Sequence, residues 1–255
     1  ARLRGAVGTQ VQMESTDPNG ETRSTILTLE VHEGAWSEPV GNYPATPLQC
    51  ETRRNEDGVG YLRFNVFAPG LMKPIRTFLR SLKPTDGLII DLRGNPGGVS
   101  EMAAGLAGWL VERELSLGVM RLRKGVMSFG VYPQDGAFTG PVAILIDGRS
   151  ASTSEILAAG LRDHARARLV GERTAGAALP SLFRALPTGD LLQYAIADVR
   201  TPKGTMIEGV GVEPDDVVAR TIADLVAGRD TVVEAATAWQ AHEAPQSKAR
   251  ADPKP

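Results

Sequence analysis

A serine-rich segment between an apolar run and a helical pattern limits the possible folds more than any other part of this sequence. The segment reads Ser-Ala-Ser-Thr-Ser-Glu at 150–155; it follows the apolar residues 142–146 and leads into the apolar residues 156–161. This order predicts a buried strand, a sharp turn and a helix. A serine at such a turn can expose its hydroxyl above a sheet, beside the free N–H groups of the helix start. Ser152 is therefore a candidate nucleophile, although serines at this place are also common helix caps.

A glycine-rich turn in the first half of the chain has similar surroundings. The apolar residues 87–92 are followed by Arg-Gly-Asn-Pro-Gly-Gly at 93–98 and then by a helical pattern over 101–113. Gly97 and Gly98 can point backbone N–H groups at a substrate carbonyl, because glycine allows close approach of the backbone. A plain strand-to-helix turn or a phosphate-binding loop would use the same residues. No Gly-Lys-Ser/Thr follows, which argues against a P-loop.

The rest of the chain alternates between strand and helix patterns. The expected strands are 60–67, 88–92, 142–146 and 168–170, and the expected helices are 73–81, 101–113, 154–164 and 221–228. This alternation predicts an α/β fold in which helices cover a sheet.

The two ends of the chain differ from this pattern. Alternating residues on both sides of Asp-Pro-Asn-Gly at 17–20 predict a β-hairpin within residues 1–35. Residues 36–47 are rich in Pro, Gly and Asn and indicate a linker, and the polar residues 240–255 indicate a disordered tail.

Taken in order, the motifs resemble the S41 peptidase family, which includes the carboxyl-terminal processing peptidases and the tricorn core protease. The resemblance starts near residue 60, includes both turns and residues 166–172, and continues through 201–204 to Ile-Glu-Gly-Val-Gly-Val-Glu-Pro-Asp at 207–215. It implies a ββα spiral core of the ClpP/crotonase type over residues 48–239, acting as a serine peptidase.

The resemblance also implies roles for single residues. Ser152 takes the place of the nucleophile, and the N–H groups of Thr153 and of Gly97 or Gly98 take the places of the oxyanion hole. Residues 1–35 look like the C-terminal part of a PDZ domain, a module that binds extended peptide termini. We therefore expect a polypeptide substrate, with recognition through its C-terminus as one mode, and a chain that starts within a longer polypeptide. The family's bacterial members are mostly exported, so a periplasmic or secreted location is expected.

One position departs from the pattern of the processing peptidases. Their general base is a lysine in a Gly-Lys-Gly turn, but this chain has Ala177 there, which excludes a Ser–Lys dyad. The tricorn-like branch instead uses a histidine from a segment N-terminal to the core, together with a downstream glutamate. Glu208 is the candidate for that glutamate, with a structural turn carboxylate as the alternative, and the histidine is expected upstream of Ala1. The histidines within the chain are interpreted as structural: His32, His164 and His242.

The composition and charge of the chain argue against several classes of function. Charges are scattered, with a formal net charge of −2, so nucleic-acid binding is not expected. The longest apolar runs are too short for a membrane span. Cys50 is the single cysteine and has no ligand partners at useful spacing, so neither a metal nor a cofactor is expected. Two alternatives stay open: a non-catalytic S41-like module that binds a peptide or lipid, and an acyl-CoA enzyme of the crotonase type.

Overall fold

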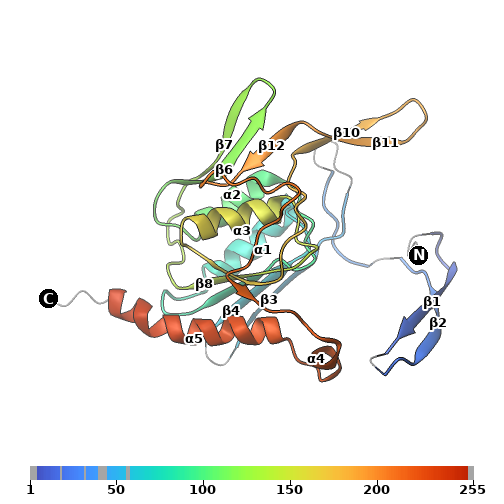
Figure 1. Ribbon diagram of the computed structural model, residues 1–255, viewed down its shortest axis with the longest axis horizontal. Helices are drawn as coiled ribbons and strands as arrows, with labels where there is room; N and C mark the ends of the chain where they lie inside the picture. Colours follow the sequence, from blue (N-terminus) through green and yellow to red (C-terminus); the bar gives the residue numbers. More distant parts are fainter. Residues whose placement is uncertain (1–4, 18, 32, 40–44, 56–57, 252–255) are drawn as a thin grey trace.

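A six-stranded sheet, in the order β13-β9-β8-β5-β4-β3, forms the centre of the molecule (Figure 1). The computed structural model describes residues 5–17, 19–31, 33–39, 45–55 and 58–251, with the backbone alone for 244–251. All neighbouring strands of this sheet are parallel except the edge pair β3–β4. Its strands are β3 (Cys50–Arg54), β4 (Gly60–Phe64), β5 (Leu88–Asp91), β8 (Val142–Ile146), β9 (Arg168–Gly171) and β13 (Asp216–Val217).

Helices cover both faces of the sheet, so its middle strands are buried throughout. One face packs against α1 (Pro69–Leu79), α2 (Ser100–Gly108) and α3 (Thr153–Asp163), and the other packs against α5 (Thr231–Ala251) (Figure 1). Every residue of β5 and β8 is buried, as expected for parallel strands with two covered faces. The predicted α/β layering is confirmed.

The predicted core elements are all present, with shifted boundaries. Helix α1 begins four residues earlier than expected, because Pro69 starts it and proline is well suited to a first helical position. Helix α2 ends at Gly108 rather than at 113. The short helix α4 (Ile222–Val226) lies within the expected range 221–228.

The C-terminal segment expected to be a disordered tail has a helical backbone in its described part. Helix α5 continues to Ala251, while 252–255 lie outside the described residues. Val232, Ala236 and Gln240 recur every four residues and form the buried side of the helix against the sheet. Gln240 is 1% exposed, and its Nε2 donates to the carbonyl of Leu88 at 2.8 Å. Gln240, the first residue of the predicted tail, is thus packed on the sheet.

The predicted N-terminal hairpin is confirmed, as β1 (Gln10–Thr16) and β2 (Thr22–Thr28). Asp17 Oδ1 accepts the N–H groups of Asn19 and Glu21, both at 2.9 Å, and Gly20 has a φ of 86°. The hairpin lies apart from the central sheet (Figure 1). Its relation to a PDZ domain stays a prediction. In the expected linker, residues 40–44 lie outside the described part, and Trp36 pairs with Pro47 as an isolated bridge.

Two further hairpin regions extend from the side of α2 and α3 (Figure 1). They comprise β6 (Leu115–Leu122), β7 (Gly125–Val131), β10 (Ser181–Ala185), β11 (Leu191–Ala195) and β12 (Ala197–Arg200). Within the described residues, no helix has the length and apolar character needed to cross a membrane.

Candidate active site

Ser152 lies at a strained turn between β8 and α3. Its φ is 55° and its ψ is −117°, in a region that residues with a side chain rarely adopt. Ser150, fully buried, holds this turn: its hydroxyl donates to the carbonyl of Leu92 at 2.8 Å and accepts the N–H of Asp147 at 3.0 Å. The sheet and the helix therefore fix a serine at the predicted sharp turn.

Asn95 joins this turn to the glycine-rich loop that follows β5. Its side chain is buried, donates to the carbonyl of Phe64 at 2.9 Å and accepts the N–H of Gly97 at 2.9 Å. Its backbone carbonyl accepts the N–H of Ala151 at 3.1 Å and the hydroxyl of Ser154 at 3.0 Å. The two loops predicted from the sequence thus meet, and Asn95 is a residue that the sequence reasoning did not single out.

Glycine at 97 and 98 allows this close approach. Gly97 has a φ of 101°, and a Cβ there would lie 2.7 Å from Ser152 Cβ and 2.9 Å from the nitrogen of Thr153. Gly98 has a φ of 137°, and a Cβ there would lie 2.4 Å from the carbonyl oxygen of Phe67. A side chain at 97 would separate the loop from the serine turn, and a side chain at 98 would push the loop away from Phe67.

The N–H groups of the two loops differ in what they bind. The Gly97 N–H is occupied by the Asn95 side chain. The N–H groups of Gly98 and Thr153 have no acceptor within the part of the chain that the structure describes. The Thr153 hydroxyl donates to the carbonyl of Gly98 at 2.8 Å, which holds the two residues together. Two uncommitted donors from separate loops therefore lie next to Ser152.

Glu155 is a buried carboxylate that organises the other side of the serine turn. Its Oε2 accepts the N–H of Ser152 at 2.9 Å and of Ala177 at 3.0 Å. Its Oε1 accepts the N–H of Gly176 at 2.8 Å and the hydroxyl of Thr174 at 2.5 Å. The pairing of Glu155 with Ser152 is that of a capping box, a signal readable in the sequence, but the contacts across to 174–177 are not.

Ala177, at the position expected for a lysine, is exposed and lies beside Glu155. Glu208 is close by in the fold, since its Oε2 accepts the N–H of Ala178 at 2.8 Å and of Leu179 at 3.2 Å. No hydrogen bond joins the described side chains of Glu208 and Ser152. These contacts are those of a turn carboxylate, and a catalytic role for Glu208 stays a prediction.

No base within the described residues hydrogen-bonds the Ser152 hydroxyl. His164 ends α3, where its Nε2 lies 2.8 Å from the carbonyl oxygen of Ser116. His242 is exposed on α5, and His32 lies outside the described residues. The described residues thus place the candidate nucleophile Ser152 beside two candidate oxyanion donors, and none of them is a base that hydrogen-bonds the Ser152 hydroxyl.

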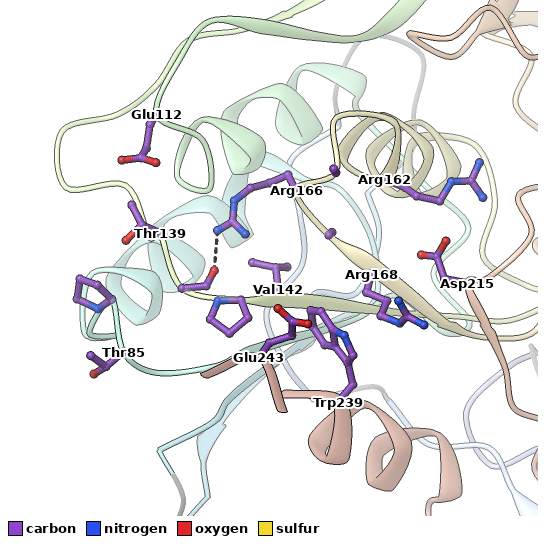
Figure 2. Close-up of a pocket in the computed structure, with 15 residues that line it drawn as sticks. Thr85, Glu112, Thr139, Val142, Arg162, Arg166, Arg168, Asp215, Trp239 and Glu243 are labelled. Carbon is purple, nitrogen blue, oxygen red and sulfur yellow. Dashed lines mark hydrogen bonds between the residues drawn. The ribbon is translucent and has the colours of Figure 1, made fainter. Parts of the chain in front are cut away.

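A cavity of about 740 Å³ lies elsewhere, at the opposite end of the parallel strands (Figure 2). Its lining includes Val142 and Arg168, which begin β8 and β9, whereas Ser152 follows the end of β8. Arg166 reaches the carbonyl of Gly140 there, at 2.9 Å. The cavity contains none of the candidate catalytic residues. Among the described residues, no cluster of three or more His, Cys, Asp or Glu could hold a metal ion.

A comparison with known proteins shows the family of the chain. Residues 58–218, well over half of the 255, match the model of peptidase family S41. The chain therefore belongs to peptidase family S41, and both turns and Ala177 lie within the matched residues.

Two curated relatives carry names of processing proteases. The chain is 31% identical over 243 residues to a "Carboxyl-terminal-processing protease" of Synechocystis sp., covering 92% of this chain and 54% of the relative. It is 32% identical over 234 residues to a "Carboxy-terminal-processing protease" of Bartonella bacilliformis, covering 88% of this chain and 54% of the relative. The chain spans about half of the length of these relatives.

A solved structure confirms the fold. The photosystem II D1 C-terminal processing protease superposes with a TM-score of 0.64 at 23% identity, covering 84% of this chain and 57% of that one. The chain thus shares its overall fold with this processing protease.

Proposed function

We propose that this protein is a serine-type peptidase that hydrolyses peptide bonds of polypeptides through Ser152. One observation carries the proposal: the strained Ser152 turn lies beside two uncommitted N–H groups, those of Gly98 and Thr153. Such donors stabilise the oxyanion that forms when a hydroxyl attacks a carbonyl. The names of the curated relatives support a polypeptide substrate.

In the proposed reaction, a base takes the proton of the Ser152 hydroxyl as its oxygen attacks the peptide carbonyl carbon. The carbonyl oxygen becomes an oxyanion and accepts the N–H groups of Gly98 and Thr153. The C–N bond then breaks, the leaving amine takes the proton from the base, and water hydrolyses the acyl-serine by the same route in reverse. Gly98 is preferred to Gly97 as donor because the Gly97 N–H already binds Asn95.

The base in this proposal is a histidine carried by a segment N-terminal to Ala1. The proposal is supported by alanine at position 177, which has no proton to exchange, and by the lack of a base at the Ser152 hydroxyl among the described residues. Glu208 would act close to Ala177, because its carboxylate accepts the backbone N–H groups of the next two residues, Ala178 and Leu179.

The proposal is tested with a fluorophosphonate probe, which phosphonylates activated serines, and with turnover of an unfolded protein. The expected result is labelling and turnover by a form extended at the N-terminus, both lost in Ser152→Ala. The 255-residue chain should show at most the weak acceleration that oxyanion donors supply alone, on the order of 10³ to 10⁴ over water. Turnover that survives in Ser152→Ala would overturn the assignment.

Ala177 also favours a second candidate function, a non-catalytic module that holds a peptide carbonyl in the Gly98 and Thr153 donors. Such a module would bind unfolded polypeptide without cleaving it. Binding by the extended form, with neither labelling of Ser152 nor turnover, would select this function over the peptidase.

A further inference from the structure

Asp230, in the connection that leads into α5, contacts the start of the glycine-rich loop. We infer that Asp230 is a positioning residue for the oxyanion hole: through Arg93 it anchors the loop that carries Gly98 to the C-terminal helix. This inference rests on the proposed function for its catalytic consequence, while the anchoring itself can be measured separately.

Arg93 is held by two carboxylates at once. Its Nε and Nη2 donate to Asp91 at 2.9 and 2.6 Å, and its Nη1 and Nη2 donate to Asp230, both at 2.8 Å. The Arg93 side chain is only 4% exposed. A buried guanidinium in two bidentate pairs has one defined orientation, because each pair fixes the plane of the fork. Asp230 supplies one of these two pairs from a residue 137 positions away.

Asp230 is itself fixed by the helix that follows it. Its Oδ1 accepts the N–H of Val233 at 3.3 Å and its carbonyl accepts the N–H of Glu234 at 2.9 Å, as at a helix start. Helix α5 is seated on the sheet by Val232 and Ala236 and by the Gln240 bond to Leu88. The carboxylate that holds Arg93 therefore belongs to a packed element rather than to a free loop.

The glycine-rich loop starts directly after Arg93. Gly94 has a φ of 73°, and its N–H donates to Asp147 Oδ1 at 2.9 Å. Three of the five residues at 94–98 are glycines, which restrict the backbone least, so the loop depends on the hydrogen bonds of Asn95 in its middle and on contacts at its two ends. Arg93 is the anchor at one end, and the pairing of Phe67 with Gly98 is the anchor at the other.

Loss of the Asp230 carboxylate would remove the second bidentate pair of Arg93 and leave Nη1 without its acceptor in the protein. The guanidinium would then turn, and the start of the loop would gain freedom. Gly98 would still bind substrate but would be less well aligned with the oxyanion, which forms only in the transition state. We therefore expect kcat to fall while KM changes little.

The test compares three variants. Asp230→Ser keeps a good helix cap but is too short to reach Arg93, and Asp230→Asn keeps the shape but not the charge. Glu234→Gln is the control, because Glu234 is an acid of the same first helical turn that binds Arg229 at 2.6 Å and does not contact Arg93. Asp230→Ser should lower kcat and the labelling rate of Ser152 about tenfold, with KM within about twofold, since a fully lost donor costs about 10²- to 10³-fold.

Amide hydrogen exchange gives a readout that needs no activity. Exchange at 94–99 should rise in Asp230→Ser, less in Asp230→Asn, and stay unchanged in Glu234→Gln, while exchange within β5 stays slow in all three. Unchanged exchange at 94–99 in Asp230→Ser, or an equal rise in Glu234→Gln, would overturn the inference. The kinetic and labelling comparisons use the form extended at the N-terminus. If that form is not labelled at Ser152 without any substitution, the proposed function fails, and the exchange comparison still decides whether Asp230 anchors the loop.

Discussion

Gly97 and Ser152 contact each other so closely that a single added carbon on Gly97 would lie 2.7 Å from Ser152 Cβ. Real carbon atoms do not approach to this distance, so the glycine-rich loop and the serine turn can meet only because residue 97 has no side chain. Both positions have a positive φ, 101° at Gly97 and 55° at Ser152. The candidate site is thus built from a glycine turn and a strained serine turn that fit together, and the following predictions concern its parts.

Gly97→Ala should disrupt the site. The methyl group would push the serine turn away, and alanine is strained at this φ, so we expect at least a 100-fold loss of Ser152-dependent activity, as for loss of an oxyanion donor. Gly136→Ala is the matched control, because Gly136 has a φ of 76° but nothing within 4 Å of an added Cβ. Calorimetry measures the loss of stability caused by backbone strain, and labelling of Ser152 measures the damage to the serine turn. Equal losses in both variants would mean that backbone strain, and not the contact with Ser152, is responsible.

Ser152→Ala should abolish peptidase activity and leave the melting temperature nearly unchanged. The Ser152 bond to Glu155 uses the backbone N–H, which alanine retains, and a lost cap costs only about 1 kcal/mol. Ser150→Ala should differ, because the buried Ser150 hydroxyl holds the turn through Leu92 and Asp147. Its removal should lower stability by about 1 to 3 kcal/mol, measured by denaturant unfolding.

Ala177→Lys should not create a working dyad in the 255-residue chain. Residue 177 is exposed, so a lysine there would remain solvated, with a pKa near its ordinary value of about 10.4, and would be protonated at neutral pH. Turnover of an unfolded protein is the measurement, with Ala175→Lys, at another exposed alanine of the same segment, as control. Activity gained only by Ala177→Lys would show that the pocket still accepts the lysine of the processing peptidases.

Glu155→Gln should cost both stability and activity. The carboxylate accepts three backbone N–H groups and the Thr174 hydroxyl, and a glutamine amide would place donors against some of them. Leaving buried donors unpaired costs about 1 to 3 kcal/mol each, so we expect unfolding to be easier by about 3 kcal/mol. Denaturant titration measures this loss of stability. Glu172→Gln is the control: Glu172 is exposed and lies two residues before Thr174, so this substitution should leave the free energy of unfolding unchanged. A stable, active Glu155→Gln protein would contradict the ordering role.

The protein should lose stability at alkaline pH, because the stabilising contribution of Tyr61 is lost when its hydroxyl ionises. Burial and the adjacent Asp91 carboxylate, which accepts the Tyr61 hydroxyl at 2.6 Å, raise the pKa of Tyr61 from 10.0 to about 12. The folded state therefore keeps this proton when the unfolded state has lost it. The stabilisation is complete below pH 10 and is lost as the pH rises toward 12, by up to about 2 to 3 kcal/mol.

Tyr61→Phe isolates this contribution. The variant should be less stable than the parent at pH 8, because Asp91 loses a donor, and the difference should shrink as the pH rises from 10 to 12. Denaturant titrations at several pH values measure it. Parallel pH profiles for parent and variant would show that Tyr61 does not titrate in this range.

The local features of the site were predictable from the sequence. The serine turn, the glycine turn and the strand–helix alternation depend on residues that are neighbours in the chain, so hydrophobic period and turn residues are enough to locate them. The same holds for the hairpin around Gly20, whereas the meaning of Ala177 came from the resemblance to the S41 family. These features limited the chain to an α/β fold with a candidate nucleophile at Ser152.

Contacts between distant segments were decided only by the tertiary structure. The sequence left Gly97 and Gly98 equivalent as donors, and it is the Asn95 side chain, oriented by the carbonyl of Phe64, that occupies one of them. Glu155 could be interpreted as a helix cap, but its bonds to 174–177 require β9 to lie beside β8. The Gln240 bond to Leu88 and the Asp230 contact with Arg93 likewise depend on the packing of α5 on the sheet. Hydrogen-bond partners far apart in a chain leave no periodic signal, because they are chosen by three-dimensional proximity alone.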